Sequence, residues 1–294
     1  MTNISVALLG LGAMGSRMAA RLLAAGHSVT VYNRSPGPLT ALVEAGATAE
    51  ASPRAAAASA EIVISMVRDD QAAAAVWLDP DRGALAGMQP GALAIEASTV
   101  TPAWIDRLGR EAEVAGLGLV DAPVLGSRPQ AEAGALISLV GGSTAAVERA
   151  RPALASYSGA IHHVGPCGAG ARLKLAVNAL FGAQVATLAE LLASLARADL
   201  PPAAMVELLA ELPVVSPVLA GVARRMAADQ HAPQFPIELV GKDLGYQLAD
   251  AEGLGAATPM TAAAEAVFAA ATTAGWGDAN LSAVVRRYYF SATM

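Results

Sequence analysis

The order of apolar and polar positions predicts strands that alternate with helices in the first part of the chain. Short apolar runs of the kind that form buried strands lie at residues 4–9, 28–32, 61–67, 92–97, 117–122, 135–141 and 161–164. Helical patterns lie between several of them, at residues 69–77, 101–115 and 144–157. Such alternation predicts an α/β fold with a mostly parallel, doubly wound sheet, which the run at 135–141 can join antiparallel. A ligand crevice is expected at the carboxyl ends of the strands.

A long helix is predicted from Gly165 to Arg197, because glycines at its start are followed by helix formers without a proline. Lys174 and Asn178 lie on one face of it, one turn apart, although by themselves they are also typical of a solvated surface helix. Further helices are predicted at residues 202–212, 217–229, 237–252, 259–274 and 281–289. The sequence therefore predicts an α/β domain over residues 1–164 and an all-helical domain over residues 165–294.

Composition narrows the classes of function. Hydrophobic residues make up 54% of the 294 residues but aromatic residues only 4%, which suits helices packed closely through alanine. The formal net charge is −6 and the pI is about 5.2, so the basic footprint of a nucleic-acid-binding protein is absent and a small-molecule partner is expected. The long helix has too many polar groups for a bilayer span, namely Arg172, Lys174, Asn178, Gln184 and Glu190.

Cysteine and histidine usage adds two expectations. Cys167 is the only cysteine, which excludes an internal disulfide, and the first residues show no basic leader, so a cytoplasmic location is expected. Cys167 itself is predicted to be a small filler rather than a nucleophile. No metal site is expected, because the histidines lack metal-ligand spacing and neighbours on a strand, such as His162 and His163, point to opposite faces.

A glycine turn follows the first predicted strand directly and opens a helical pattern. Its residues are Gly10, Leu11, Gly12, Ala13, Met14 and Gly15. Strand, glycine turn and helix in this order form the dinucleotide-binding fingerprint of a Rossmann domain. The first glycine permits the tight turn, the second lets the backbone approach a pyrophosphate, and the third lets the helix pack on the strand. The helix N-terminus then faces the phosphates.

The end of the second strand indicates which dinucleotide binds. An NAD site usually has a carboxylate there for the ribose 2′-hydroxyl, whereas this chain has Asn33, Arg34 and Ser35. A guanidinium can pair with a 2′-phosphate, and Ser35 can add a donor. NADP is therefore predicted, with NAD as the less favoured cofactor. The alternative interpretation of Arg34 is an ordinary exposed loop arginine.

Three further segments are candidates for the crevice. Met66 and Val67 end one strand and Ser98 and Thr99 end the next, so these positions are expected beside the nicotinamide, although Ser98 and Thr99 also fit a helix cap. The loop at residues 121–134 contains Gly126, Ser127 and Arg128, whose amides, hydroxyl and charge suit an anion. A plain turn explains this loop almost as well.

Four motifs, taken together, resemble the β-hydroxyacid dehydrogenase family from end to end. They are GLGAMG at Gly10, DAPVLGSRPQAEAG at Asp121, the run from Gly165 to Asn178, and KDL at Lys242. The resemblance implies a Rossmann domain joined by a long helix to a helical dimerisation domain. It also implies a homodimer or homotetramer.

The same resemblance implies roles for individual residues. Lys174 is implied as the catalytic acid/base, and Asn178 as the residue that orients the substrate. Thr99 and Lys242 match cofactor contacts near the nicotinamide. The substrate-binding positions are implied to be Gly126 and Ser127 in the carboxylate loop, and Phe235 and Asp243 in the helical domain.

One position departs from the family pattern. The family loop commonly reads APVSG, whereas this chain has Leu125 in place of the serine. The loss of that hydroxyl removes a hydrogen bond worth about 0.5–1.5 kcal/mol. We expect a substrate that is larger or less polar at that end than 3-hydroxyisobutyrate. The remainder of the loop is closest to the glyoxylate/succinic semialdehyde reductase branch.

The sequence thus predicts an NADP-dependent oxidoreductase that interconverts a small aldehyde and its hydroxy acid. Lys174 is expected to donate the proton, with its pKa lowered by desolvation. The alternatives are an imine reductase, a related class that usually lacks a lysine at this position, and a noncatalytic NADP-binding sensor module. A decarboxylating phosphogluconate dehydrogenase is disfavoured because the chain is too short for its larger helical domain.

Overall fold

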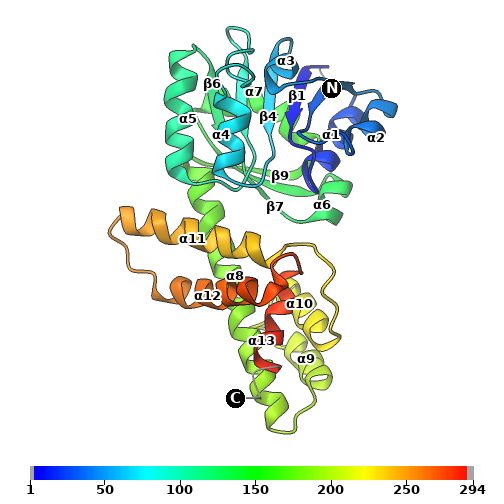
Figure 1. The fold of residues 1–294 in the computed structure, drawn as a ribbon, viewed down its shortest axis with the longest axis vertical. Helices are drawn as coiled ribbons and strands as arrows, with labels where there is room; N and C mark the ends of the chain where they lie inside the picture. Colours follow the sequence, from blue (N-terminus) through cyan, green and yellow to red (C-terminus); the bar gives the residue numbers. More distant parts are fainter. Residues whose placement is uncertain (1–2, 290–294) are drawn as a thin grey trace. The chain divides into compact units, whose positions relative to one another are not determined.

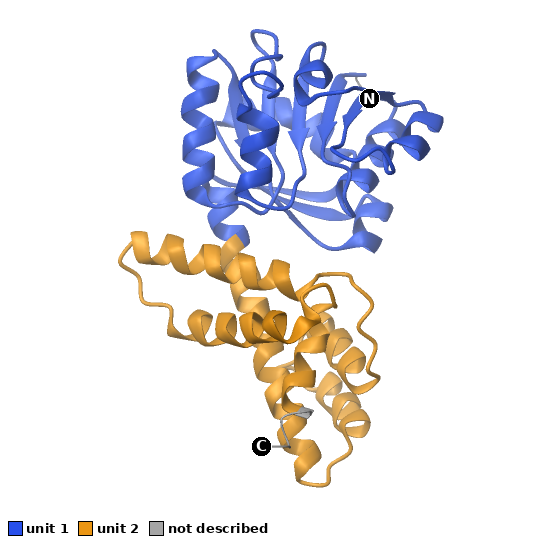
Figure 2. Cartoon of the chain, viewed as in Figure 1, with its two compact units in different colours: residues 1–174 blue, residues 175–294 orange. Residues whose placement is uncertain are grey.

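The computed structural model describes residues 3–289. The chain divides into two compact units, Met1–Lys174 and Leu175–Met294, coloured separately in Figure 2. The division falls inside the long helix α8 (Ala169–Arg197), because the first turns of this helix pack on the sheet of the first unit. The boundary predicted from the sequence, after residue 164, lies near the end of the last strand instead.

The first unit is built on a mixed nine-stranded sheet (Figure 1). Its strands are β1 (Ser5–Leu9), β2 (Ser28–Tyr32), β3 (Thr48–Ala49), β4 (Ile62–Ser65), β5 (Leu93–Glu96), β6 (Gly118–Asp121), β7 (Val124–Leu125), β8 (Leu136–Gly141) and β9 (Ser158–Gly165). The order is β3-β2-β1-β4-β5-β6-β8-β7, and β9 pairs with β8. The first six strands in that order are parallel, and β8 is antiparallel to β6 and β7. The predicted Rossmann-type sheet and its antiparallel late strand are therefore confirmed.

Helices cover both faces of this sheet, as the unbroken apolar strands require. They are α1 (Gly15–Ala24), α2 (Leu39–Glu44), α3 (Pro53–Ala57), α4 (Asp70–Leu78), α5 (Pro102–Val114), α6 (Arg128–Ala133) and α7 (Thr144–Ala155). Alternate residues of β1 enter different cores: Leu8 packs with Met18 of α1, whereas Leu9 packs in the cluster that contains Trp77 of α4. The sheet is thus buried on both sides.

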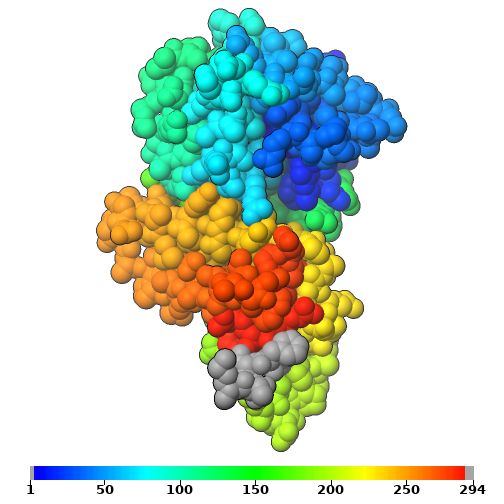
Figure 3. Space-filling view, in the orientation of Figure 1, coloured from blue at the N-terminus to red at the C-terminus, as the bar shows by residue number. Residues whose placement is uncertain are grey.

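The second unit is all-helical, as predicted. It contains the greater part of α8 together with α9 (Pro202–Glu211), α10 (Pro217–Ala227), α11 (Ile237–Gly253), α12 (Pro259–Ala271) and α13 (Arg286–Tyr289). A π-helical turn, η1 (Thr272–Trp276), follows α12, and a 3-10 turn, η2 (Leu281–Val285), precedes α13. The space-filling view shows side chains of α11, α12 and η2 closing over one face of the unit (Figure 3).

The long helix α8 has the length and hydropathy of a membrane span, alone among helices of the described chain. Within its most apolar window, however, 44% is buried inside the protein. Val185, Leu188 and Leu192 belong to the core of the helical unit, where they pack with residues such as Phe268. A core helix of a globular unit accounts for this pattern.

Candidate active site

The glycine turn between β1 and α1 has the geometry that the fingerprint predicts. Gly10 has φ 97°, and a Cβ there would lie 2.5 Å from the Met66 carbonyl oxygen. A Cβ on Gly15 would collide with the Gly10 carbonyl. For Gly12, in contrast, no described atom lies within 4 Å of an added Cβ. The protein's own packing therefore requires Gly10 and Gly15, whereas the turn has room at Gly12 for close approach of a pyrophosphate to the backbone.

Asn33 fixes the neighbouring turn at the end of β2. Its Oδ1 accepts a hydrogen bond from the Leu11 amide at 2.9 Å, and its Nδ2 donates to the Ser35 carbonyl at 2.8 Å and to Ser35 Oγ at 3.0 Å. Arg34 is exposed, and no hydrogen bond or ion pair engages it among residues 3–289. The chain therefore holds the glycine turn and the 33–35 segment together and presents Arg34 to solvent.

The ends of β4 and β5 are joined through a buried carboxyl group. Ser98 Oγ accepts from the Val67 amide at 2.8 Å, and Glu96 Oε1 accepts from the Ser98 amide at 2.9 Å. Glu96 Oε2 accepts from the Trp77 indole at 2.9 Å and lies 3.5 Å from that of Trp104. Complete burial raises the pKa of Glu96, against the effect of these hydrogen bonds. Ser98 is itself buried, and its hydroxyl holds the Met66–Val67 backbone.

Thr99 is half-buried at the same edge of the sheet, and the helix cap expected nearby is supplied by a different residue. Thr101 is the N-cap of α5 and accepts from the Trp104 amide at 3.0 Å. The side chain of Thr99 is thus not needed as that cap.

The loop after β6 forms a short strand and a short helix. Leu125 lies in β7 opposite Ile137. Ser127 is the N-cap of α6, and the Gln130 side chain accepts from the Ser127 amide at 3.0 Å in a capping box. Arg128 follows with its Nε shielded from solvent and without a hydrogen-bond partner in the described chain. The amide and hydroxyl of Ser127 therefore serve the helix cap, and Arg128 carries the uncompensated charge of this loop.

The start of α8 is held by a buried aspartate. Asp121, at the end of β6, accepts from the amides of Gly168 and Ala171, both at 2.7 Å. A Cβ on Gly170 would collide with the Leu139 carbonyl of β8, so the start of this helix lies close against the sheet. Burial raises the pKa of Asp121 while the two amides lower it. Lys174 follows one turn later, with only 8% of its surface exposed.

Cys167 lies beside the same aspartate. Desolvation of the thiol, together with the charges of Asp121 and Asp106, raises the pKa of Cys167 to about 12. The thiolate form is therefore suppressed at neutral pH, which disfavours a nucleophile, but Cys167 is exposed and is not the packed filler that the sequence predicts.

Lysine usage marks two positions. The sequence contains 19 basic residues, of which only Lys174 and Lys242 are lysines. Lys174 is buried, and the side chain of Lys242 is 16% exposed. Arginine supplies every other basic side chain of the chain. Because an amine can release a proton and a guanidinium cannot, this usage singles out the same two residues as the motifs.

The helical unit contributes a buried polar cluster. Asn178 of α8 donates from Nδ2 to Asp243 Oδ2 of α11 at 2.6 Å, with 6% and 2% of these residues exposed. Lys242 pairs with Asp243 Oδ1 at 2.9 Å and lies over the Tyr246 ring, 4.5 Å from its centre. Asp243 thus contacts two other predicted site residues, Asn178 and Lys242, within one unit.

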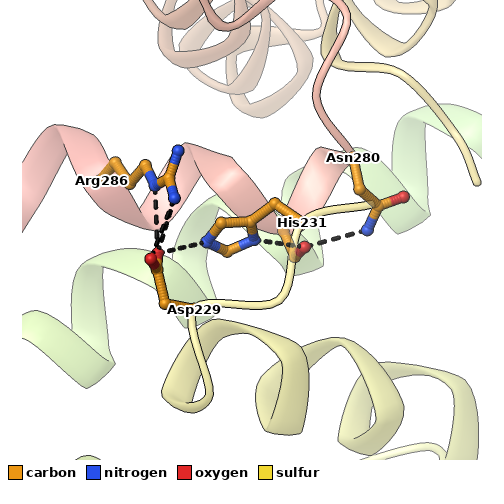
Figure 4. Close-up of polar contacts among 5 residues, drawn as sticks. Asp229, His231, Asn280 and Arg286 are labelled. Atoms are coloured by element: carbon orange, nitrogen blue, oxygen red, sulfur yellow. Dashed lines mark hydrogen bonds and ion pairs between the residues drawn. The ribbon is translucent and has the colours of Figure 1, made fainter. Parts of the chain in front are cut away.

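The buried Asn280 belongs to a separate polar network with His231, Asp229 and Arg286 (Figure 4), and it also holds Phe235. Asn280 Oδ1 accepts from the Phe235 amide at 3.0 Å, and His231 bonds Ser282 Oγ at 2.9 Å and Asp229 at 3.0 Å. Arg286 closes the network through a forked pair with Asp229. Desolvation, and then Arg286, lowers the pKa of His231, so the ring is neutral near pH 7. The network fixes the segment that leads into α11.

Comparison with known proteins covers both units of the chain. Residues 5–165 match the family described as the NAD binding domain of 6-phosphogluconate dehydrogenase, and residues 168–288 match "NAD-binding of NADP-dependent 3-hydroxyisobutyrate dehydrogenase". The 3-hydroxyisobutyrate dehydrogenase of Pseudomonas aeruginosa is 37% identical over 270 residues, 90% of each chain. The chain belongs to the β-hydroxyacid dehydrogenase family.

Two further relatives, from different branches of the β-hydroxyacid dehydrogenase family, are also similar to this chain over most of its length. Glyoxylate/succinic semialdehyde reductase 2, chloroplastic, of Arabidopsis thaliana is 32% identical over 283 residues, which cover 96% of this chain and 79% of that protein. The crystal structure of a 3-hydroxyisobutyrate dehydrogenase from Salmonella typhimurium is 27% identical, with a TM-score of 0.88 over 97% of this chain and all of that one. The predicted family, fold and enzyme class are confirmed, and relatives of different branches match at similar levels.

As a member of this family the chain is an NAD(P)-dependent dehydrogenase or reductase. Within residues 3–289 no three His, Cys, Asp or Glu side chains gather as metal ligands. Sequence patterns did not identify Glu96, Asn280 or the cap formed by Asp121, because their partners are distant in the chain. The scarcity of lysine in the sequence could have identified Lys174 and Lys242 as candidate site residues.

Proposed function

We propose that this dehydrogenase is an NADP-dependent reductase that converts a small aldehyde acid into its hydroxy acid. The observation that carries the proposal is the burial of Lys174, one of only two lysines, one turn from Asn178 on α8. The nicotinamide, when bound, supplies the hydride. The glycine turn Gly10–Gly15, Met66, Val67, Thr99 and Lys242 are assigned to holding it.

Lys174 acts as the acid/base. As hydride reaches the carbonyl carbon, negative charge develops on the oxygen, and the Lys174 ammonium donates the proton that gives the hydroxyl group. In the oxidative direction the neutral amine takes that proton back. An arginine at this position would remain protonated and could not complete the cycle.

Asn178 orients the substrate through its amide oxygen. Its Nδ2 donates to Asp243 at 2.6 Å, which holds the rotamer, so Oδ1 remains as an acceptor for the hydroxyl group of the hydroxy acid. Asp243 thereby acts through Asn178, and the Lys242 ion pair holds Asp243 in turn. Phe235, which the Asn280 network fixes, lines the substrate position in this proposal.

Arg34 and Ser35 select NADP. Asn33 anchors the segment to the glycine turn, and the Arg34 guanidinium is exposed without a competing partner in residues 3–289. A guanidinium can hold a 2′-phosphate through a charge-assisted fork. No carboxylate at the end of β2 opposes that charge, which also supports NADP over NAD.

The substrate carries an anionic group that Arg128 and the backbone at Gly126 receive, while Ser127 holds the start of α6 as its N-cap. The uncompensated charge of Arg128 supports this assignment, and Leu125 replaces the hydroxyl that the family commonly offers. Glyoxylate and succinic semialdehyde, named for one relative, are acids of this kind. A substrate with more apolar surface at the Leu125 end is expected to be preferred. Ser98 is buried and its hydroxyl already accepts from the Val67 amide, so we assign it to holding the Val67 backbone and not to direct contact with the substrate.

The enzyme is proposed to form a homodimer or homotetramer through its helical unit. Large apolar side chains are exposed on α8, α9, α10 and the loop between the last two, namely Leu180, Leu191, Leu208, Leu212, Val214 and Val218. A second copy would cover such a surface. A cytoplasmic location is proposed because Cys167 is the only cysteine, so that no internal disulfide can form, although one relative is chloroplastic.

The test is NADPH oxidation against a panel of aldehyde acids, bulky aldehydes and cyclic imines, with the wild type, Lys174→Ala and the control Arg172→Ala on the same helix. Loss of about 10²–10⁴-fold in aldehyde turnover by Lys174→Ala alone, with NADPH still bound, supports the acid/base role. Faster reduction of imines than of aldehydes would favour the imine reductase. NADPH binding without any turnover would favour the sensor module.

A further inference from the structure

An ion pair joins the glycine turn to the loop that we assign to the substrate. Arg17, in the first turn of α1, donates from Nη1 to the Ala13 carbonyl at 2.8 Å and from Nε to Glu132 Oε1 of α6 at 2.7 Å. Ala13 belongs to the glycine turn, and α6 begins directly after Ser127. One guanidinium therefore touches both segments, which are more than a hundred residues apart in sequence.

A second arginine of α1 lies against the same C-terminal end of α6, two residues beyond Glu132. Gly134 ends α6 with φ 67°, and a Cβ there would lie 2.8 Å from Nε of Arg21. Arg21 itself donates to the Ser156 carbonyl at 3.4 Å. Helix α6 has only six residues, too few to hold its place by propensity alone, so its position depends on these contacts with α1.

We propose that Arg17 and Glu132 are positioning residues that couple dinucleotide binding to the order of the substrate loop. The inference rests on the proposed function of both segments. When a dinucleotide fixes the glycine turn, the Ala13 carbonyl fixes the Arg17 guanidinium, which fixes Glu132 and, through it, the six-residue helix α6 that follows Gly126 and Ser127. Coupling of this kind is reciprocal: a ligand that orders the loop tightens dinucleotide binding by the same factor.

Hydrogen–deuterium exchange with and without NADPH tests the coupling without requiring turnover. In the wild type, NADPH is expected to slow exchange at residues 9–20 and also, about two- to fivefold, at residues 122–134, the range that a partly exposed ion pair can transmit. In Glu132→Gln the slowing at residues 9–20 persists and that at residues 122–134 disappears. Arg17→Met gives the same loss at residues 122–134.

Glu148→Gln is the matched control, because it breaks an ion pair with Arg151 at 2.8 Å on α7 that touches neither segment. It should behave as the wild type. Persistence of the slowing at residues 122–134 in Glu132→Gln overturns the coupling, since direct contact with NADPH would then explain it. Absence of any NADPH effect in the wild type overturns the inference together with the cofactor assignment. An enzyme that shows the coupled slowing but reduces no aldehyde contradicts only the proposed function.

Discussion

Asn178 donates its side-chain N–H to the carboxylate of Asp243 across 2.6 Å, and both side chains are buried. This hydrogen bond joins α8 and α11 within one unit. Because it occupies Nδ2, it leaves the oxygen of the Asn178 amide available to a ligand. A charge-assisted hydrogen bond of this kind contributes about 1.5–3 kcal/mol.

Asp243→Asn therefore should lower kcat/KM for the aldehyde by about 10- to 100-fold, because the Asn178 amide can then rotate. The Kd of NADPH, measured by fluorescence, separately reports any effect that passes through Lys242, which pairs with Asp243. Glu252→Gln near the end of the same helix is the control, since Glu252 is exposed and should leave kcat/KM unchanged. Equal kcat/KM for Asp243→Asn and the wild type would show that the amide needs no such anchor.

Arg34→Ala tests the cofactor assignment. Loss of a charge-assisted contact to the 2′-phosphate should lower kcat/KM for NADPH by about 10- to 100-fold and leave the value for NADH within about twofold. Arg110→Ala, which removes an exposed arginine of α5, controls for the change in net charge. A parallel loss with both cofactors would instead indicate that Arg34 supports the turn.

These roles differ in how far the sequence reveals them. The strands and the glycine turn were predictable, because apolar runs and glycine spacing are local signals. Helix α6 was expected as a loop, since six residues are too few to show helical periodicity. The bonds Arg17–Glu132 and Asn178–Asp243 join residues far apart in the chain, and only the packing of helices brings them together.

The sequence also did not reveal which carboxyl groups are buried. Glu96 follows three apolar residues of β5 and is the acid at the end of an ordinary strand pattern, yet it is enclosed by the two indoles of Trp77 and Trp104. The sequence places Asp121 at the start of a loop, although its carboxylate accepts hydrogen bonds from two amides at the start of α8. In both cases the carboxylate lies at the end of a central parallel strand, where amides and indoles from neighbouring elements converge.

Leu125→Ser tests the selectivity of the substrate loop. A restored hydroxyl should raise kcat/KM for small aldehyde acids up to about tenfold relative to bulky aldehydes, because a carboxylate gains one hydrogen bond. Leu125→Ala removes the side-chain bulk without adding a donor, so it separates size from polarity. The same ratio of rates in all three proteins would mean that position 125 does not contact the substrate.

Glu96→Gln tests the buried carboxyl through the pH dependence of stability. Burial raises the pKa of Glu96 in the folded state above its unfolded value, so the folded state holds the proton more tightly. The contribution of Glu96 is therefore fully present below the unfolded pKa of about 4.5 and is lost as pH rises through the higher folded pKa. Glutamine cannot titrate, and its amide group places a donor against the indole or amide donors, so the variant should be less stable by about 1–3 kcal/mol at low pH.

The free energy of unfolding of both proteins, from urea titrations between pH 5 and pH 8, gives the comparison. The advantage of the wild type over Glu96→Gln should shrink as pH rises, because only the wild type must ionise a buried acid. An advantage that instead grows with pH would mean that the four or more surrounding donors stabilise the carboxylate more than burial penalises it. Glu61→Gln provides a control whose difference from the wild type should stay constant between pH 5 and pH 8, since hydrogen bonds from Ser5 lower the pKa of this exposed acid and its contribution is lost only at more acid pH.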